Sequence, residues 1–392
     1  MLDLNEEQRL IQTEIRSLCK EYGDEYWRQK DRDAEYPMDF VQTFGDYGWL
    51  GAVIPEEYGG AGLDTLEASI ILEEIAASGG GFNGAMSVHG AIFIPRSIIN
   101  YGSEQMKREY LPQLASGEKL LQCFALTEPN AGFDSTAITT RAERSDDSYV
   151  VNGQKTWTSR LHASDYMVLV ARTTPREAVE KKTDGISLFI VDVADAKSQG
   201  AIDAEEIEKN VRPAVPSYEV WLEDLEVPAE NLIGTAGNGF TQVLDGLNEE
   251  RIVIAAESIG LARVAIEKAT TYANEREVFG RQIGKNQAIQ HPLADAYARI
   301  TSARNITYQA ARAFKQGRDA GEAANIAAYM AREAATKATD QAVQTHGGYG
   351  VAVEYDVERY YRDARLARIA PVSDEMILNY IGEHILGLPR SY

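Results

Sequence analysis

The 392-residue sequence has few of the residues that build disulfide-rich or metal-binding proteins. Its two cysteines, Cys19 and Cys123, stand far apart and predict neither a disulfide framework nor a zinc module. Five isolated histidines show no helical metal-ligand spacing, so we expect no protein-held metal. Glu6 and Glu7 occupy the place where a secretory signal has basic and then apolar residues, and we therefore expect a cytoplasmic protein.

Long apolar runs and positive charge are also scarce. The longest mostly apolar stretch, 252–266, contains Glu257 and Arg263 and falls short of the roughly 20 residues that span a bilayer. The 39 basic residues are outnumbered by 60 acidic ones, and a net charge of -21 repels nucleic acids and anionic lipid surfaces. We therefore expect neither nucleic acid nor a membrane as a partner.

What the sequence does contain is typical of a globular protein of two or three domains. Hydrophobic residues make up 44% and charged residues 25%, which excludes disordered and collagen-like chains. The first part reads as helices joined by glycine-rich turns. Asn5 and Gln8 predict a capping box at the first helix, and the segment 55–62, with one proline and three glycines, predicts a loop.

From about residue 122 the pattern changes to short β-type runs. Tyr149 to Val151, the pair Asn152-Gly153 and the run from Lys155 predict two strands joined by a type I′ turn. Further strands are expected at 166–171, 186–193 and 218–227. The polar, proline-bearing segment 194–216 is interpreted as a connecting segment that runs over the protein surface.

After Gly239 the sequence is helical again and predicts a four-helix layer. The expected fold class is α+β multidomain, with an N-terminal helical domain at 1–121, a middle β domain at 122–234 and a C-terminal helical domain at 235–392. No strand is followed by Gly-x-Gly-x-x-Gly, and no Gly-x-x-x-x-Gly-Lys-Ser/Thr occurs. This disfavours a nicotinamide dehydrogenase or a kinase.

Residue chemistry alone singles out Glu250 as a candidate general base. Leu247 and Ile254 lie one turn before and after it, so its carboxyl would project along an apolar stripe and its pKa would rise. Glu249 has a similar claim. The alternative, that Glu249, Glu250 and Arg251 form a solvated helix face, stays open at this point.

Three other features have an ordinary structural reading beside a functional one. Trp157 is more often the core of a sheet than a cofactor platform. The glycine-rich segment 347–350 is by default a helix cap rather than a ligand-cradling turn. Arg276 and Arg281 would ordinarily be helix-end charges.

Several short motifs occur along the chain in the order that is typical of one protein family. They lie at 55–60, 126–132, 152–157, 227–234, 276–280 with Gln287, and 344–350. In this order they resemble the acyl-CoA dehydrogenase family over nearly the whole chain. The resemblance implies a β-barrel-like middle domain and a C-terminal four-helix bundle, with homotetramers or homodimers assembled around FAD.

The resemblance also implies binding residues. Those implied to line the flavin are Phe124, Leu126, Thr127, Trp157 and Ser159, the last standing where the family usually has threonine. Those implied for the rest of the cofactor, held mainly from the neighbouring subunit, are Arg276, Phe279, Gln287, Gln344, Gly347, Gly348, Ser373 and Glu375. Those implied to contact the substrate are Phe133, Phe240, Asn248 and Arg251.

The chain departs from the family at the usual base. Most members place a glutamate in a Tyr-Glu-Gly-Thr motif, where this chain has Pro371. A minority branch that resembles isovaleryl-CoA dehydrogenase places this glutamate before an arginine, which matches Glu250 and Arg251.

Pro371 lacks the backbone amide that the family offers to the thioester carbonyl. A shift in register must supply another donor, or the carbonyl depends more on the flavin ribityl hydroxyl. Phe133 replaces a common serine. The stretch Phe82-Asn83-Gly84 has no arginine where glutaryl-CoA dehydrogenases keep one for the distal carboxylate, so no dicarboxylic substrate is expected.

The resemblance therefore implies an enzyme of fatty acid metabolism. It would oxidise an acyl-CoA to the 2,3-enoyl-CoA with Glu250 as base, and would pass electrons to an electron-transfer flavoprotein. The position of the base favours a branched or bulky acyl chain. An acyl-CoA oxidase or other flavin oxidase on the same fold, and a catalytically silent acyl-CoA binder, stay open as alternatives.

Overall fold

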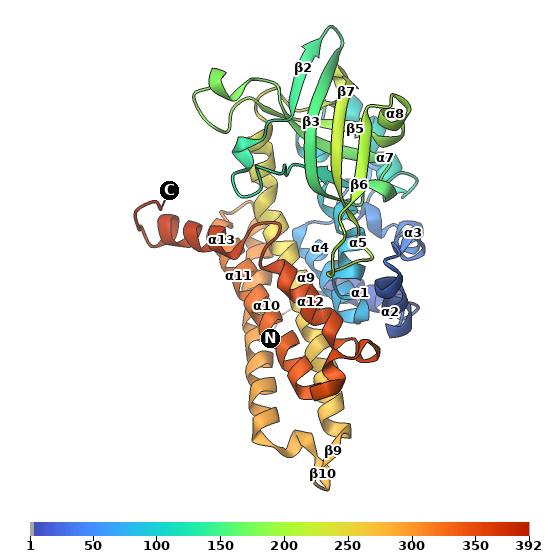
Figure 1. The fold of residues 1–392 in the computed structure, drawn as a ribbon, viewed down its shortest axis with the longest axis vertical. Coiled ribbons are helices and arrows are strands. Elements are labelled where there is room, and N and C mark those ends of the chain that lie inside the picture. The colour runs from blue at the N-terminus through green and yellow to red at the C-terminus, as the bar shows by residue number, and fades with distance from the viewer. Residues whose placement is uncertain (1–3, 392) are drawn as a thin grey trace.

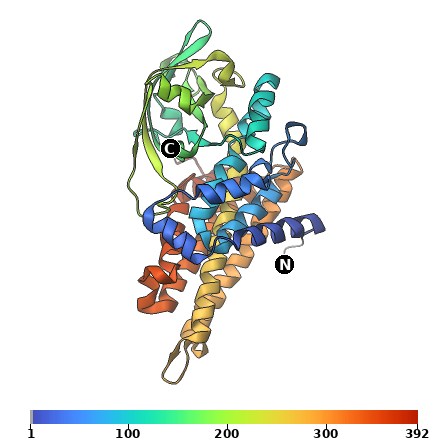
Figure 2. The same ribbon diagram turned by 90° about the vertical axis from the view of Figure 1, so that its right-hand side faces the viewer.

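The computed structural model describes residues 4–391 and has the helix, sheet, helix order that the sequence predicts. The β-sheet forms one end of an elongated molecule, and the long C-terminal helices extend to the opposite end (Figure 1). The N-terminal helices lie beside the middle of the molecule (Figures 1 and 2). The predicted fold class is confirmed, whereas the exact domain limits stay a prediction.

The N-terminal part consists of helices whose buried apolar side chains pack partly against the C-terminal helices and partly against the sheet. The capping box is confirmed, since Gln8 N donates to Asn5 Oδ1 over 2.8 Å and Asn5 N donates to Gln8 Oε1 over 3.1 Å. The helices are α1 (Glu6–Cys19), α2 (Asp24–Asp33), α3 (Met38–Asp46), α4 (Thr65–Ile75), α5 (Gly81–Phe93), α6 (Arg96–Tyr101) and α7 (Glu104–Ala115).

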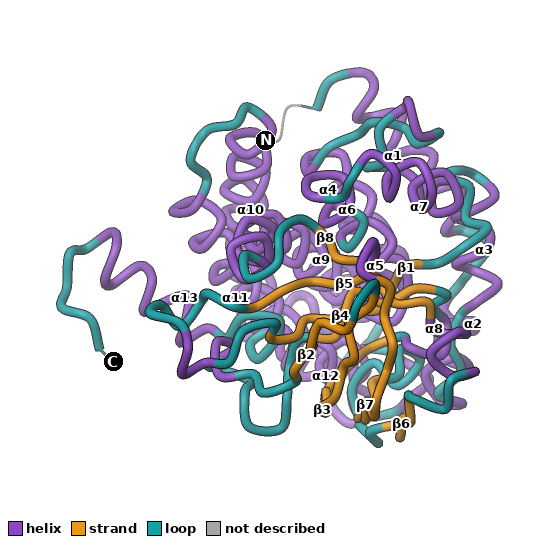
Figure 3. The backbone as a smooth tube through the Cα atoms, turned by 90° about the horizontal axis from the view of Figure 1, so that it is seen from above, coloured by secondary structure: helices purple, strands orange, loops and turns teal. Residues whose placement is uncertain are grey.

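The middle part is an eight-stranded sheet with the order β6-β7-β3-β2-β4-β5-β8, in which β1 pairs with β4 in parallel (Figure 3). The strands expected at 166–171, 186–193 and 218–227 are confirmed as β4, β5 and β7. The elements are β1 (Leu121–Ala125), β2 (Arg141–Ser145), β3 (Ser148–Ser159), β4 (Tyr166–Arg172), β5 (Ile186–Asp192), α8 (Val193–Ser198), β6 (Ile202–Glu206), β7 (Ser217–Pro228) and β8 (Leu232–Ile233).

The predicted hairpin at Asn152-Gly153 is wrong. Strand β3 continues through both residues, and the turn lies before it, where Asp146 has a φ of 47°. Gly153 serves a different purpose, because a Cβ there would lie 2.4 Å from Thr140 Oγ1. The segment 194–216 is also more ordered than predicted, since most of α8 falls within it and β6 pairs with β7.

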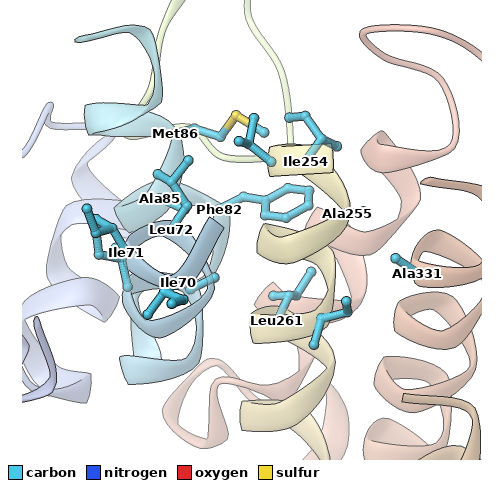
Figure 4. Close-up of a cluster of buried hydrophobic side chains, with 14 of the residues drawn as sticks. Ile70, Ile71, Leu72, Phe82, Ala85, Met86, Ile254, Ala255, Leu261 and Ala331 are labelled. Carbon is cyan, nitrogen blue, oxygen red and sulfur yellow. The ribbon is translucent and has the colours of Figure 1, made fainter. Parts of the chain in front are cut away.

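The C-terminal part is built around α9, a helix of 37 residues that packs against α4, α10 and α11. Phe82 and Met86 of α5 face Ile254 and Leu261 of α9 in the shared core (Figure 4). Across residues 4–391, no helix combines the length and the apolar character needed to cross a membrane. The elements are α9 (Gly239–Glu275), β9 (Glu277–Val278), β10 (Arg281–Gln282), α10 (Gln287–Lys315), α11 (Gly321–His346), α12 (Val357–Ala367) and α13 (Asp374–Tyr380).

The contact between α4 and α9 depends on a glycine. A Cβ at Gly260 would lie 2.2 Å from the Glu73 carbonyl oxygen, so Gly260→Ala should lower the free energy of unfolding by about 1 to 3 kcal/mol despite the better helix propensity of alanine. Gly246→Ala on the same helix is the control, because its Cβ would meet only Phe93 at 3.6 Å. Urea denaturation measures both, and equal stabilities would contradict the close packing.

Candidate functional site

Hydrogen bonds connect the loop after β1 to strand β3 and fix the position of the loop backbone. Thr156 N donates to Thr127 O over 2.9 Å. The buried Lys155 Nζ donates to Leu126 O over 3.0 Å and to Glu128 Oε1 over 2.8 Å. The structure thus brings the predicted flavin contacts Leu126 and Thr127 next to the strand that carries Trp157.

Trp157 itself lies on the surface, so the alternative interpretation of this residue as part of the sheet core is wrong. Its side chain is 57% exposed and its φ is 57°, within a register irregularity between Lys155 and Thr158. The irregularity turns the indole out of the sheet beside the Thr127 loop. An exposed indole next to ordered backbone groups fits a flat aromatic ligand such as an isoalloxazine ring. Phe124, another predicted flavin contact, is half-buried near the end of β1.

Ser159 lies at the end of β3 in a polar corner. Its Oγ is 2.9 Å from Ser217 Oγ and 3.4 Å from Arg212 Nη2. Arg212 N donates to Asp363 Oδ1 over 3.2 Å, and burial lowers the pKa of Arg212 to about 10. Arg212 Nε has no hydrogen-bond partner within residues 4–391. A buried donor of this kind fits a site that receives a polar ligand.

Glu250 projects from α9 as a half-buried side chain that makes no hydrogen bond within the described chain. Burial raises the pKa of its carboxyl, and the charges of His89, Arg251 and Arg332 only partly offset the effect. The reading of Glu250 as part of a solvated face is therefore wrong. An unpaired carboxylate whose pKa is raised accepts a proton more readily than an exposed one, which suits a general base.

The neighbouring Glu249 has a different environment. It is 5% exposed, accepts a hydrogen bond from Thr65 Oγ1 over 2.7 Å, and lies 2.9 Å from Arg96 Nη2. Both partners come from the N-terminal helices, so Glu249 joins these helices to α9. Next to the pair, Arg251 Nη1 donates to Asn248 Oδ1 over 3.1 Å.

A second group of predicted residues lies at the far end of the bundle. A hollow of about 1240 Å³ between the β9–β10 hairpin and the turn after α11 is lined by Arg276, Phe279, Gly347 and Gly348 among others. The Phe279 ring is fully exposed. The remaining members of the predicted set, Gln287 and Gln344, are exposed and adjoin lining residues.

The other predicted residues are more scattered. Ser373 caps α13, with its Oγ accepting from Met376 N over 3.4 Å, and Glu375 is exposed. The segment around Pro371 is held by Arg332 Nη1, which donates to Val372 O over 2.6 Å. Phe133 is exposed, whereas Phe240 is buried in the core between sheet and helices. Their ligand roles stay predictions.

Several polar residues of this region were missed in the sequence. Arg160 is buried and donates to Gln122 O and Met86 O, each over 2.8 Å, and the carboxyls of Glu250 and Glu257 act on it electrostatically. For Lys155 on β3 and His89 on α5, the available signal was a polar residue at a core-facing position of a strand or helix. Arg160 and Arg212 lie in turns outside the strands, where no periodicity marks them.

Comparisons with known proteins give matches along nearly the whole chain. Three family models match successive parts of the chain: the acyl-CoA dehydrogenase N-terminal domain at 5–118, the middle domain at 123–225 and the C-terminal domain at 237–386. The resemblance inferred from the sequence motifs is confirmed.

Individual proteins match over nearly their full length. An acyl-CoA dehydrogenase of Mycobacterium tuberculosis is 37% identical over 99% of this chain and 98% of its own. A glutaryl-coenzyme A dehydrogenase solved with glutaryl-CoA is 33% identical, with a TM-score of 0.91 over 100% of this chain and 98% of its own. Butyryl-CoA dehydrogenase from Megasphaera elsdenii is 30% identical, with a TM-score of 0.92 over 98% of this chain and 100% of its own.

Proposed function

Because the chain belongs to the acyl-CoA dehydrogenase family, we propose that it oxidises an acyl-CoA thioester to the 2,3-enoyl-CoA with Glu250 as the base that removes the α-proton. Family membership makes it an FAD-dependent oxidoreductase. Bound FAD supplies the hydride acceptor. The residues of the chain bind and orient the thioester, hold the flavin ring and move the proton.

The contrast between Glu249 and Glu250 carries the proposal. The Glu249 carboxylate already accepts a hydrogen bond from Thr65 and pairs with Arg96. The Glu250 carboxyl has no hydrogen-bond partner in the described chain, and burial raises its pKa. The usual alternative position holds Pro371, which cannot accept a proton. Removal of the α-proton by a positioned carboxylate contributes about 10² to 10⁴-fold to the rate of such reactions.

The cofactor is proposed to lie between two copies of the chain. The residues that we propose to face the flavin lie at the sheet, whereas Arg276 follows the end of α9, about 40 Å along the helix axis from Glu250. A single FAD cannot reach both groups within one subunit. A homodimer or homotetramer, in which the hollow at Arg276 receives the adenosine diphosphate end of a neighbour's FAD, accounts for both groups.

Arg276→Ala should weaken FAD binding about 10- to 100-fold, because a charge-assisted hydrogen bond to a phosphate is worth about 1.5 to 3 kcal/mol. Fluorescence titration of the apoprotein with FAD measures the effect. Lys285→Ala, an exposed cation outside the lining of the hollow, is the control and should bind FAD normally. Equal affinities in the two variants would remove Arg276 from the cofactor site.

Anaerobic mixing with a panel of acyl-CoAs tests the function itself. A substrate should bleach the flavin absorbance and yield the 2,3-enoyl-CoA, and the reduced enzyme should pass its electrons to an electron-transfer flavoprotein. Rapid reoxidation by oxygen would identify an oxidase instead. If acyl-CoAs bind but none of them bleaches the flavin, the protein is a catalytically silent acyl-CoA binder.

A further inference from the structure

The face of α9 that carries Glu250 carries a second carboxyl, that of Glu257. The two residues are seven positions apart, which is close to two helical turns and about 10 Å along the axis. Glu257 is 0% exposed. Its Oε1 lies 2.8 Å from Nδ1 of His89 on α5, while its Oε2 has no hydrogen-bond partner within residues 4–391.

Apolar side chains pack beside Glu257 and His89. Phe82 and Met86 of α5 and Ile254 of α9 lie between the same two helices (Figure 4). A buried carboxyl oxygen without a donor is costly, and buried polar atoms in folded proteins almost always have a partner. Packing against apolar side chains does not supply one. The free oxygen therefore indicates a donor that comes from a ligand.

The exposure of α9 indicates which part of a substrate reaches Glu257. On the N-terminal side of Glu250, Leu244 is 44% exposed and Asp245 is also exposed. On the C-terminal side, residues 252–262 are continuously buried. With the α-carbon placed at Glu250, the polar coenzyme A portion would extend toward the exposed side, and the acyl chain would extend along the buried side toward Glu257.

The charges near the pair select the kind of donor. The guanidinium groups of Arg160 and Arg212 both interact electrostatically with Glu257, and Arg160 interacts with Glu250 as well. Arg251 and Arg332 also act on Glu250, so cations of the chain already surround the two carboxyl groups and a further cationic donor is disfavoured. An anionic group has no hydrogen to donate to a carboxylate oxygen, whereas a neutral hydroxyl group can donate one to Oε2.

We propose that Glu257, oriented by His89, is a specificity-determining residue that accepts a hydrogen bond from a hydroxyl on the acyl chain, on the order of 10 Å from the α-carbon. This inference rests on the proposed function, because it places the α-carbon at Glu250. A hydrogen bond to Glu257 would make hydroxylated acyl-CoAs of medium length better substrates than plain acyl-CoAs of equal length.

The test compares hexanoyl-, octanoyl- and decanoyl-CoA with their ω-hydroxy derivatives in anaerobic flavin reduction. The wild type should prefer the hydroxylated member of at least one pair by about tenfold or more in rate constant over dissociation constant, since a site with a buried hydrogen-bonding group rejects ligands that leave it unpaired. Glu257→Leu should abolish or reverse this preference. Glu267→Leu, on an exposed position of the same helix, is the control and should retain it.

A second measurement needs only the wild type. The ω-methoxy derivatives keep the oxygen but donate no hydrogen bond, so they should react no better than the plain acyl-CoAs. Equal constants within every pair, or a preference that persists in Glu257→Leu, would overturn the inference while leaving acyl-CoA dehydrogenation intact. Absence of flavin reduction by every acyl-CoA would instead contradict the proposed function on which it rests.

Discussion

Glu250→Gln is expected to lower the rate of flavin reduction by at least about 10² to 10⁴-fold, with FAD content and acyl-CoA affinity unchanged. Glutamine keeps the size of the side chain and an acceptor oxygen but cannot take a proton at neutral pH. Because the side chain of Glu250 makes no hydrogen bond within residues 4–391, the substitution should leave the fold undisturbed. Stopped-flow measurement of flavin absorbance with a saturating substrate gives the rate.

Glu249→Gln is the matched control on the adjacent residue. It weakens the contacts to Thr65 and Arg96, so it should lower the melting temperature while flavin reduction stays close to normal. The opposite result, with reduction lost in the Glu249 variant and kept in the Glu250 variant, would show that the base is the neighbouring residue. Full activity of both variants would place the base elsewhere.

The same carboxyl should govern the acidic side of the pH profile. Burial raises the pKa of Glu250 above its ordinary value, and only the deprotonated form can accept the α-proton. The rate of flavin reduction should therefore fall as the pH drops through this raised pKa, at a higher pH than an exposed glutamate would give. Glu250→Gln should remove this limb from the residual activity.

The sequence predicted the order of the three structural regions because helical and alternating periodicities differ strongly over long segments. It failed at Asn152-Gly153, where local turn chemistry pointed to a hairpin. There the glycine is required by the close approach of Thr140 across the sheet, a contact between strands that no local pattern reveals. The pairing of β3 with β7 then overrides the turn signal.

The candidate base shows a second limit of sequence reasoning. Glu249 and Glu250 have similar neighbours along the helix, and only tertiary contacts separate them. Thr65 and Arg96 reach Glu249 from α4 and α6, which lie far away in sequence. The motif resemblance selected Glu250 by position, and the contacts supply a physical reason for that choice. His89 and Glu257 were missed for the same reason, since their proximity depends on how α5 packs against α9.

Lys155→Met should lower both the free energy of unfolding and the affinity for FAD. Lys155 and Glu128 form a buried pair, and burial lowers the pKa of Lys155 to about 8, which leaves it charged at neutral pH. Methionine preserves the length of the side chain but leaves the Glu128 carboxylate without its cation, at a cost of about 3 to 5 kcal/mol. It also frees the Leu126 carbonyl, so the loop at Thr127 should lose its fixed position beside Trp157.

Two further variants separate this role from a general effect of removing a lysine. Lys119→Met breaks an exposed pair with Asp165 in the same region and should change neither property appreciably, because solvent screens such pairs. Adding Glu128→Gln to Lys155→Met removes the unpaired buried charge and should restore part of the stability, although the Leu126 carbonyl still lacks its donor. FAD affinity should then recover less than stability does. Equal recovery of both would mean that Lys155 acts only by neutralising Glu128, and no recovery of stability would show that the charge pair is not what the substitution disrupts.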